Sequence, residues 1–241
     1  MSLAGRTVLV TAGAKRIGRT LALAAARAGA DVVIHYRSSR REAEAAGAEV
    51  QAEGRKAVLL QADLSDPSQA EMLIGRALEQ GPLFALVNNA AVFEPLNWES
   101  TDLAGWEHTL AVNLTAPFLL SQAFARSLGR NRAGRIVNLL DWRALRPGAD
   151  HLPYTVSKAA LAALTRSLAV ALAPNVTVNG LALGAALPPS DGPIPAALLE
   201  AVPARRWADL EEVGQALLFL LDGPAYVTGE ILHLDGGRHL T

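Results

Sequence analysis

The sequence predicts an α/β fold, a single doubly wound domain whose seven-stranded parallel sheet carries helices on both faces. Short runs rich in β-branched residues alternate with longer Ala- and Leu-rich segments along all 241 residues. The strand-like runs are almost continuously apolar, as expected for strands that are buried on both faces. Because strand and helix alternate strictly, we expect parallel strands joined by right-handed crossovers. No repeat or linker divides the chain, so residues 1–241 are predicted to form one domain.

Local patterns define the individual elements. The predicted strands are, in chain order, Thr7–Thr11, Asp31–Tyr36, Ala57–Gln61, Phe84–Asn88, Arg135–Leu140, Thr177–Gly180 and Glu230–Leu234. The predicted helices are Arg16–Arg27, Arg40–Glu53, Ser68–Glu79, Leu103–Leu128, Tyr154–Leu172 and Leu210–Leu221. Gly29 and Gly54 follow the first two helices, and glycine is a common residue just after a helix. The proline-rich stretch Gly184–Pro203 is long and irregular, which predicts a functional loop or lid.

Composition excludes several classes of function. The formal net charge is -1 and the basic residues are scattered, so nothing indicates a nucleic-acid partner. The chain has no cysteine, which excludes disulfides, thiolate metal sites and thiol catalysis, and its five histidines lack metal-ligand spacing. The sequence shows no signal peptide and no run of about 20 apolar residues. We therefore expect a cytoplasmic protein that acts on a small molecule, without a membrane or metal partner.

The first predicted turn has features of a phosphate-binding site. The strand Thr7–Thr11 is followed by Ala12-Gly13-Ala14-Lys15-Arg16-Ile17-Gly18, and a helix begins at once. Small residues allow the backbone to approach a pyrophosphate, and the helix N-terminus offers free N–H groups and a positive dipole end. The spacing is not GxGxxG, so a plain tight turn remains the alternative for this stretch taken alone.

Charges after the second strand favour NADPH over NADH. NAD sites usually place an acidic residue there to bind the ribose hydroxyls. In this chain Tyr36 is followed by Arg37-Ser38-Ser39-Arg40. An arginine beside two hydroxyls suits a 2′-phosphate, and Lys15 and Arg16 lie on the facing turn. A solvated basic loop is the alternative.

Polar residues also end three later strands. Asp63 follows Ala57–Gln61, Asn88 and Asn89 end the next strand, and Asp141 follows Arg135–Leu140. Ligands in doubly wound folds bind beyond the carboxyl ends of the strands. We expect Asp63 and its neighbours to receive the adenine, and the small residues after Asn89 to leave room for a flat ring. Each polar residue alone could instead cap a turn.

Tyr154 and Lys158 are spaced to act together. At positions i and i+4 of one helix, the phenol and the ammonium lie on the same face. A nearby ammonium favours the phenolate, so we expect Lys158 to lower the pKa of Tyr154 from about 10. Tyr154 would then be a usable proton donor near neutral pH.

Together these motifs resemble the short-chain dehydrogenase/reductase family over nearly the whole chain. The matching residues are the first turn, Asp63-Leu64, Asn88-Asn89-Ala90, Asn113, Tyr154 with Lys158, Val178-Asn179-Gly180 and Leu234-Asp235-Gly236-Gly237. The resemblance implies a Rossmann sheet of order 3-2-1-4-5-6-7, a mobile substrate loop at about 185–205, and commonly a homotetramer. It also implies that Tyr154 donates the proton, that Lys158 holds the nicotinamide ribose, and that Asn113 supports a proton-relay water.

Departures from the general family pattern narrow the resemblance. Ala12 and Arg16 replace the first two turn glycines, and Asp141 replaces the usual catalytic serine. The Lys-Arg-Ile-Gly turn and the aspartate resemble the pteridine reductase branch, in which a phenylalanine at the position of Phe93 stacks the pterin against the nicotinamide. The usual Pro-Gly after the sixth strand is Leu183-Gly184, which we expect to alter the lid.

The chemistry of Asp141 also favours the pteridine reductase branch. A carboxylate beside a ketone would repel the developing oxyanion. Reducing a pterin C=N bond instead delivers a proton to a ring nitrogen, and a carboxylate near Tyr154 can pass protons and accept ring N–H hydrogen bonds. Packing in the core for Phe93 and capping of a turn for Asp141 are the alternatives.

The sequence thus predicts an NADPH-dependent reductase of dihydropterins or dihydrofolate. The alternatives are a carbonyl or 3-oxoacyl reductase and a non-catalytic NADPH-binding protein, because fold alone does not prove function. The predicted catalytic residues are Asn113, Asp141, Tyr154 and Lys158. The predicted substrate-binding residues are Arg16, Phe93, Asp141 and Tyr154. The predicted cofactor-binding residues are Gly13, Lys15, Arg16, Ile17, Gly18, Tyr36, Arg37, Ser38, Asp63, Leu64, Asn89, Ala90, Tyr154, Lys158 and Gly184.

Overall fold

The sheet has seven parallel strands in the order β3-β2-β1-β4-β5-β6-β7. The computed structural model describes residues 2–129, 132–186 and 197–241. The strands are β1 (Thr7–Val10), β2 (Asp31–Tyr36), β3 (Ala57–Gln61), β4 (Ala85–Asn88), β5 (Gly134–Asp141), β6 (Val176–Leu183) and β7 (Ile231–Leu234). The predicted fold class and strand order are confirmed. Because all strands run the same way, their carboxyl ends share one edge of the sheet.

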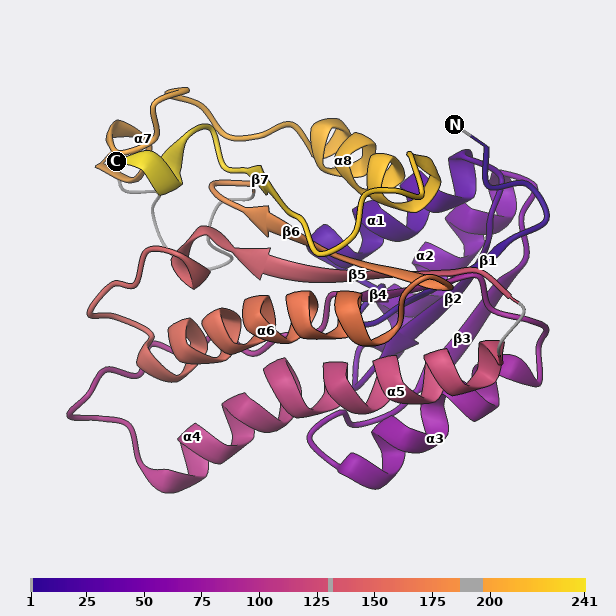
Figure 1. The fold of residues 1–241 in the computed structure, drawn as a ribbon, viewed down its shortest axis with the longest axis horizontal. Helices are drawn as coiled ribbons and strands as arrows, with labels where there is room; N and C mark the ends of the chain where they lie inside the picture. The colour runs from indigo at the N-terminus through magenta and orange to yellow at the C-terminus, as the bar shows by residue number, and fades with distance from the viewer. Residues whose placement is uncertain (1, 130–131, 187–196) are drawn as a thin grey trace.

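Helices cover both faces of the sheet (Figure 1). On one face lie α1 (Arg16–Arg27), α2 (Arg40–Ala52) and α8 (Leu210–Asp222). On the other lie α3 (Pro67–Leu78), α4 (Leu103–Leu110), α5 (Ala116–Leu128) and α6 (Leu152–Ala171), with α3 against α5 and α4 against α6. Among the described residues, no helix is long and apolar enough to cross a membrane.

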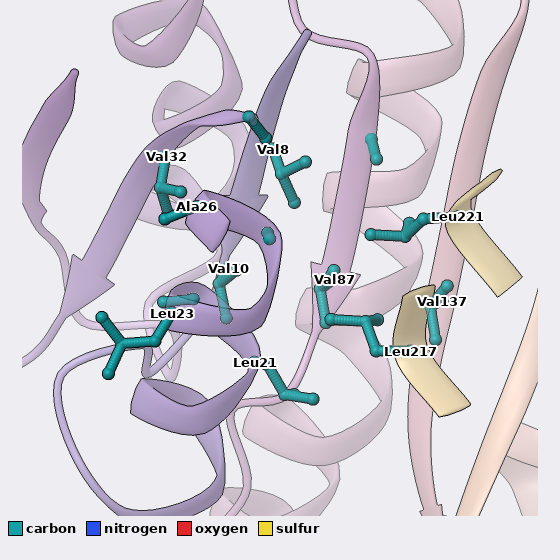
Figure 2. Packing of buried hydrophobic residues seen from close by; sticks show 14 of the residues in the cluster. Val8, Val10, Leu21, Leu23, Ala26, Val32, Val87, Val137, Leu217 and Leu221 are labelled. Atoms are coloured by element: carbon teal, nitrogen blue, oxygen red, sulfur yellow. The ribbon is translucent and has the colours of Figure 1, made fainter. Parts of the chain in front are cut away.

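The core is aliphatic and layered. Figure 2 shows Val10 of β1 and Val87 of β4 beside Leu21 of α1 and Leu217 of α8. All four side chains are fully buried. Burying one such side chain is worth about 1.5–3 kcal/mol, so these contacts fix the strands whose carboxyl ends carry the site.

The helix predicted over Leu103–Leu128 is interrupted by a π-helical turn. The structure has α4, then η1 (Ala111–Thr115) with π-type hydrogen bonding, and then α5. A π-turn inserts one extra residue into the helix and often marks a functional site. Sequence periodicity does not detect a single extra residue, and here the turn contains Asn113.

Other boundaries differ in ways that have local reasons. α6 begins at Leu152, before the predicted Tyr154, because Pro153 is tolerated in the first turn of a helix. β6 extends through Gly180, which the prediction made the last residue of the strand. A Cβ at Gly180 would lie 2.5 Å from Leu140 Cδ1, so close packing with β5 explains the glycine. Residues 187–196 of the predicted loop lie outside the described residues, and α7 (Ala197–Glu200) occupies part of the remainder.

Candidate active site

The turn after β1 keeps the shape of a glycine turn although two of its glycines are replaced. Ala12 and Arg16 have φ angles of 48° and 49°, in the left-handed region that favours glycine. Gly18 is required, because a Cβ there would collide with the carbonyl oxygen of Ala12. α1 therefore begins directly against the turn, with its free N–H groups facing the carboxyl edge of the sheet.

His35 holds this turn, and the sequence analysis did not assign it a role. The Ala12 N–H donates to His35 Nδ1 at 3.0 Å, and His35 Nε2 lies 3.1 Å from the carbonyl oxygen of Ala62. The Gly13 N–H also donates to the His35 carbonyl at 2.9 Å. Burial lowers the pKa of His35 to about 4, so the ring is neutral and can accept from Ala12 while it donates to Ala62. His35 thereby joins the turns after β1 and β3.

A cavity of about 470 Å³ opens beyond β1, β2 and β3. It contains most of the predicted cofactor-binding residues. Those that line it are Lys15, Arg16, Ile17, Gly18, Tyr36, Arg37, Ser38, Asp63, Leu64, Asn89 and Ala90. Asp63 accepts hydrogen bonds from the backbone and hydroxyl of Ser65, which hold its pKa below the usual range. Lys15 is paired with Glu42 at 3.6 Å, so part of its charge is already neutralised.

Four predicted cofactor residues do not line this cavity: Gly13, Tyr154, Lys158 and Gly184. Gly13 sits behind the turn, where a Cβ would meet the Val10 carbonyl oxygen at 3.0 Å. Gly184 packs against β7, where a Cβ would lie 2.6 Å from Asp235 Cα. Neither residue lines the cavity, so close packing accounts for both glycines.

Asp141 and Tyr154 meet at the carboxyl end of β5. The Tyr154 hydroxyl donates to Asp141 Oδ2 at 3.1 Å, and the Arg143 backbone N–H donates to Asp141 Oδ1 at 2.9 Å. Lys158 is buried one turn further along α6, and its Nζ donates to the Leu139 carbonyl at 2.7 Å. The spacing prediction that Tyr154 and Lys158 share one helix face is correct, with Nζ 5.6 Å from the centre of the Tyr154 ring.

The predicted direction of the Tyr154 pKa is wrong in this structure. Burial raises the pKa of Tyr154 well above its usual value, and the Asp141 carboxylate raises it further. Burial also raises the pKa of Asp141 and lowers that of Lys158 to about 8. The Lys158 ammonium donates to a backbone carbonyl instead of the phenol, whereas the Asp141 carboxylate contacts the phenol directly. Burial and the adjacent Asp141 carboxylate therefore raise the pKa of Tyr154 together, and burial is the larger cause.

Asn113 is fixed by the π-turn. Its Oδ1 accepts from the Val92 N–H at 2.8 Å, and its Nδ2 donates to the Val92 carbonyl and to Ser157 Oγ, each at 3.0 Å. These bonds join the helix to the segment after β4 and to α6. Within the described residues, Asn113 makes no direct hydrogen bond to Tyr154 or Lys158.

Phe93 lies beside the Asp141–Tyr154 pair and is not a core residue, since it is 53% exposed. Its ring stacks on His151 with centres 3.9 Å apart and planes 8° apart. The same ring meets Tyr154 edge-on, with the two centres 4.6 Å apart. His151 covers one face of the Phe93 ring, and the exposed part of the ring lies beside the phenol.

The chain is similar in sequence to a family of reductases and to individual reductases from bacteria. Residues 12–239 match the family described as "Enoyl-(Acyl carrier protein) reductase". The chain is 31% identical to a 3-oxoacyl-[acyl-carrier-protein] reductase of Synechocystis, covering 98% of both chains. It is 34% identical to 5-keto-D-gluconate 5-reductase of Escherichia coli K12, covering 98% of this chain and 96% of that protein.

Solved structures of a reductase and a dehydrogenase are similar to this chain in fold and in sequence. FolM alternative dihydrofolate reductase 1 from Brucella canis, complexed with NADP, has a TM-score of 0.90 and 34% identity, covering 100% of this chain and 97% of that one. A short chain dehydrogenase from Burkholderia cenocepacia, also in complex with NADP, has a TM-score of 0.93 and 35% identity, covering 99% of both chains. With a family match over most of the chain and relatives above 30% identity over nearly its full length, this chain belongs to the short-chain dehydrogenase/reductase family.

Proposed function

We propose that this protein is an NADPH-dependent reductase of dihydropterins or dihydrofolate. The observation that carries the proposal is the carboxylate of Asp141, hydrogen-bonded to the Tyr154 hydroxyl at 3.1 Å. The half-exposed ring of Phe93 beside this pair offers a surface on which a flat heterocycle can stack. Similarity to a FolM alternative dihydrofolate reductase supports the same substrate class.

The protein is an oxidoreductase that uses NADPH, and its residues fit that cofactor. The crowding at Gly18 leaves a cradle in which α1 presents free N–H groups to a pyrophosphate. Arg37, Ser38 and Arg16 line the same cavity, and we assign them to the 2′-phosphate. The similar FolM and Burkholderia proteins were solved with NADP. NADPH supplies the hydride.

The chain's own residues supply the proton. Tyr154 donates from its hydroxyl to the substrate nitrogen, and Asp141 reprotonates Tyr154 through the hydrogen bond that joins them. Burial raises the pKa of Asp141, which increases the fraction of this carboxyl that carries a proton at a given pH. Lys158 is assigned to the nicotinamide ribose and Asn113 to the positioning of a relay water.

Reduction of a carbonyl is the second candidate. Relatives named as 3-oxoacyl and 5-keto-D-gluconate reductases favour it. The ionised form of Asp141 opposes it, because a negative charge beside a developing oxyanion is repulsive. A non-catalytic NADPH-binding protein is a weaker alternative, since binding alone would not need a buried Asp–Tyr–Lys cluster.

One substrate panel separates these functions. NADPH oxidation is followed with dihydrobiopterin, dihydrofolate and a 3-oxoacyl thioester, using wild-type protein and Asp141→Ser. We expect the wild type to reduce a pterin and Asp141→Ser to lose that activity by about 10²-fold or more. Efficient reduction of the thioester with no turnover of either pterin would refute the pteridine assignment and leave the family assignment intact.

Assembly is a separate proposal. We propose a homotetramer on the basis of family resemblance. Light scattering coupled to size-exclusion chromatography measures the mass in solution, and a mass near one 25.3 kDa chain would contradict it.

A further inference from the structure

Two arginine side chains lie beside the proposed reduction site. Arg143 belongs to η2 (Trp142–Ala144), which follows Asp141, and its Cζ lies 4.8 Å from the centre of the Trp142 ring. Arg238 belongs to η3 (Arg238–Leu240), which contacts η2, and its Cζ lies 4.7 Å from the centre of the same ring. Two cations therefore share one indole, close to the carboxyl edge of the sheet.

The protein neutralises Arg143 only in part. Its Nη2 donates to Asp150 Oδ2 at 2.7 Å, and that oxygen is shared with His151 Nδ1. Its Nε is buried and has no hydrogen-bond acceptor within residues 2–129, 132–186 and 197–241. A guanidinium carries five N–H donors, so the single bond to Asp150 leaves most of them without a protein acceptor in that part of the chain.

Arg238 lacks even that counter-ion. In the described part of the chain its guanidinium has no acidic partner, and its contact is with the Trp142 ring. Some surface arginines are paired with an acidic side chain, such as Arg19 with Glu49, Arg27 with Glu53 and Arg206 with Glu212. Cationic side chains held on an aromatic face with their donors unused can accept an anion.

Arg143 also lies on the substrate side of the molecule. Arg143 Cζ is 5.9 Å from the centre of the Phe93 ring, and Phe93 meets Tyr154 edge-on at 4.6 Å. A substituent on a ring stacked at Phe93 therefore has Arg143 within reach. The planar fork of arginine matches a carboxylate, to which it can donate two parallel hydrogen bonds.

We propose that Arg143 and Arg238 form an anion-binding site beside the reduction site, and that the substrate carries a carboxylate on a chain attached to the ring that is reduced. This inference rests on the proposed function and selects within it. Dihydrofolate carries a glutamate with two carboxylates, whereas dihydrobiopterin carries none. The arginine pair therefore favours a folate-like substrate.

Binding of two non-reacting ligands tests the site independently of turnover. The dissociation constants of folic acid and of biopterin are measured on NADP⁺-saturated protein. We expect wild-type protein to bind folic acid more tightly than biopterin. Arg143→Met should raise the dissociation constant of folic acid by about 10- to 100-fold and leave that of biopterin unchanged. Methionine keeps the apolar contacts with Trp142 and Phe93, so packing loss is small. Arg146→Met, which removes an exposed charge from the same loop, should change neither ligand.

A second variant separates recognition from structural support. Asp150→Asn removes the counter-ion of Arg143 and should tighten folic acid binding, whereas a purely structural ion pair predicts weaker binding of both ligands. Equal weakening of folic acid and biopterin by Arg143→Met, or no wild-type preference for folic acid, overturns the anion site.

A matched 3-oxo acid and its methyl ester separate failure of the site from failure of the pterin proposal. If the protein reduces no pterin but prefers the acid over the ester in an Arg143-dependent way, the anion site stands and the pterin assignment falls.

Discussion

The carboxyl edge of the sheet has a cofactor end, beyond β1–β3, and a catalytic end, beyond β5, and the two ends are built in different ways. Beyond β1, β2 and β3, the site is shaped mainly by backbone geometry, because Ala12 and Arg16 adopt left-handed conformations. Neutral His35 accepts a hydrogen bond from the turn after β1 and donates one to the turn after β3. Beyond β5, the site is built from ionisable side chains: Tyr154 and Lys158 are buried, and the partly buried Asp141 accepts a hydrogen bond from the Tyr154 hydroxyl.

This difference matters for what each end can do. The cradle is shaped by backbone geometry and by His35, whose pKa of about 4 keeps its ring neutral near pH 7. A cluster of ionisable groups with displaced pKa values changes protonation during a reaction, which a cradle cannot do. We therefore expect substitutions at the β5 end to alter turnover and its pH dependence, and substitutions at the β1–β3 end to alter cofactor affinity.

The largest effect is expected for Tyr154→Phe. The variant loses the only proton donor assigned to the substrate, so turnover should fall by about 10²–10⁴-fold. NADPH affinity, measured by fluorescence titration, should stay close to wild type. Lys158→Ala should reduce both, and the double variant should lose far less than the product of the single losses, since the two residues act as a unit. Substantial activity in Tyr154→Phe would show that the proton comes from elsewhere.

Asp141→Asn is expected to change stability and activity in opposite directions at pH 7: the protein becomes more stable and less active. Burial raises the folded-state pKa of Asp141, so the folded protein binds its proton more tightly than the unfolded chain does. Stability from this group is thus present below the unfolded pKa of about 4 and is lost as pH rises through the raised value. Asparagine never ionises, so the variant should unfold at higher denaturant concentration than wild type at pH 7 and lose this advantage near pH 4.

The same variant should reduce pterins about 10²-fold more slowly, and its rate should no longer decline as the pH rises through the Asp141 pKa. Denaturant titrations and rate profiles across pH measure the two effects. If Asp141→Asn is both less stable at pH 7 and unchanged in its pH profile, Asp141 is a structural cap and not a proton reservoir.

A smaller effect is expected at the other end, for Arg37→Ala. A charge-assisted contact to a phosphate is worth about 1.5–3 kcal/mol, or about ten- to a hundred-fold in affinity. Only NADPH carries the 2′-phosphate, so its dissociation constant should rise by that factor while that of NADH hardly changes. Titration of the variant with both cofactors measures the ratio, and equal losses would remove Arg37 from the phosphate site.

The alternation of strands and helices and the position of the cofactor turn were predictable from residue type and spacing, whereas the strand order and the Asp141–Tyr154 pair were predictable from the family resemblance. Three features were not. The π-turn around Asn113 adds one residue without disturbing the apolar pattern. The pKa of Tyr154 is raised first by burial and then by the Asp141 carboxylate, which comes from another element, whereas spacing along the helix indicated only Lys158. His35 lies in an otherwise apolar strand, and the strand pattern does not predict the two hydrogen bonds that its ring makes.

The smallest effect on NADPH affinity is expected at His35, where acid stability tests how the turn is held. Its folded-state pKa of about 4 lies below the unfolded value of about 6.5, so the unfolded chain binds the proton more readily. Stability should therefore be complete above pH 6.5 and fall by about 3 kcal/mol as the pH drops to 4. His35→Asn places an amide oxygen near the Nδ1 position, so it can still accept from the Ala12 N–H. It cannot be protonated in this range.

We expect His35→Asn to bind NADPH within about threefold of wild type at pH 7 and to lose much of the acid-dependent destabilisation. His35→Phe has the size of the ring without an acceptor, leaves the Ala12 N–H unpaired, and should weaken NADPH further than asparagine does. Arg76 and Asp63 also face His35, with opposite effects on its pKa, so Arg76→Gln serves as a control for charge alone. If asparagine and phenylalanine weaken NADPH equally, the hydrogen bond to Ala12 does not shape the turn, and the cradle depends on packing.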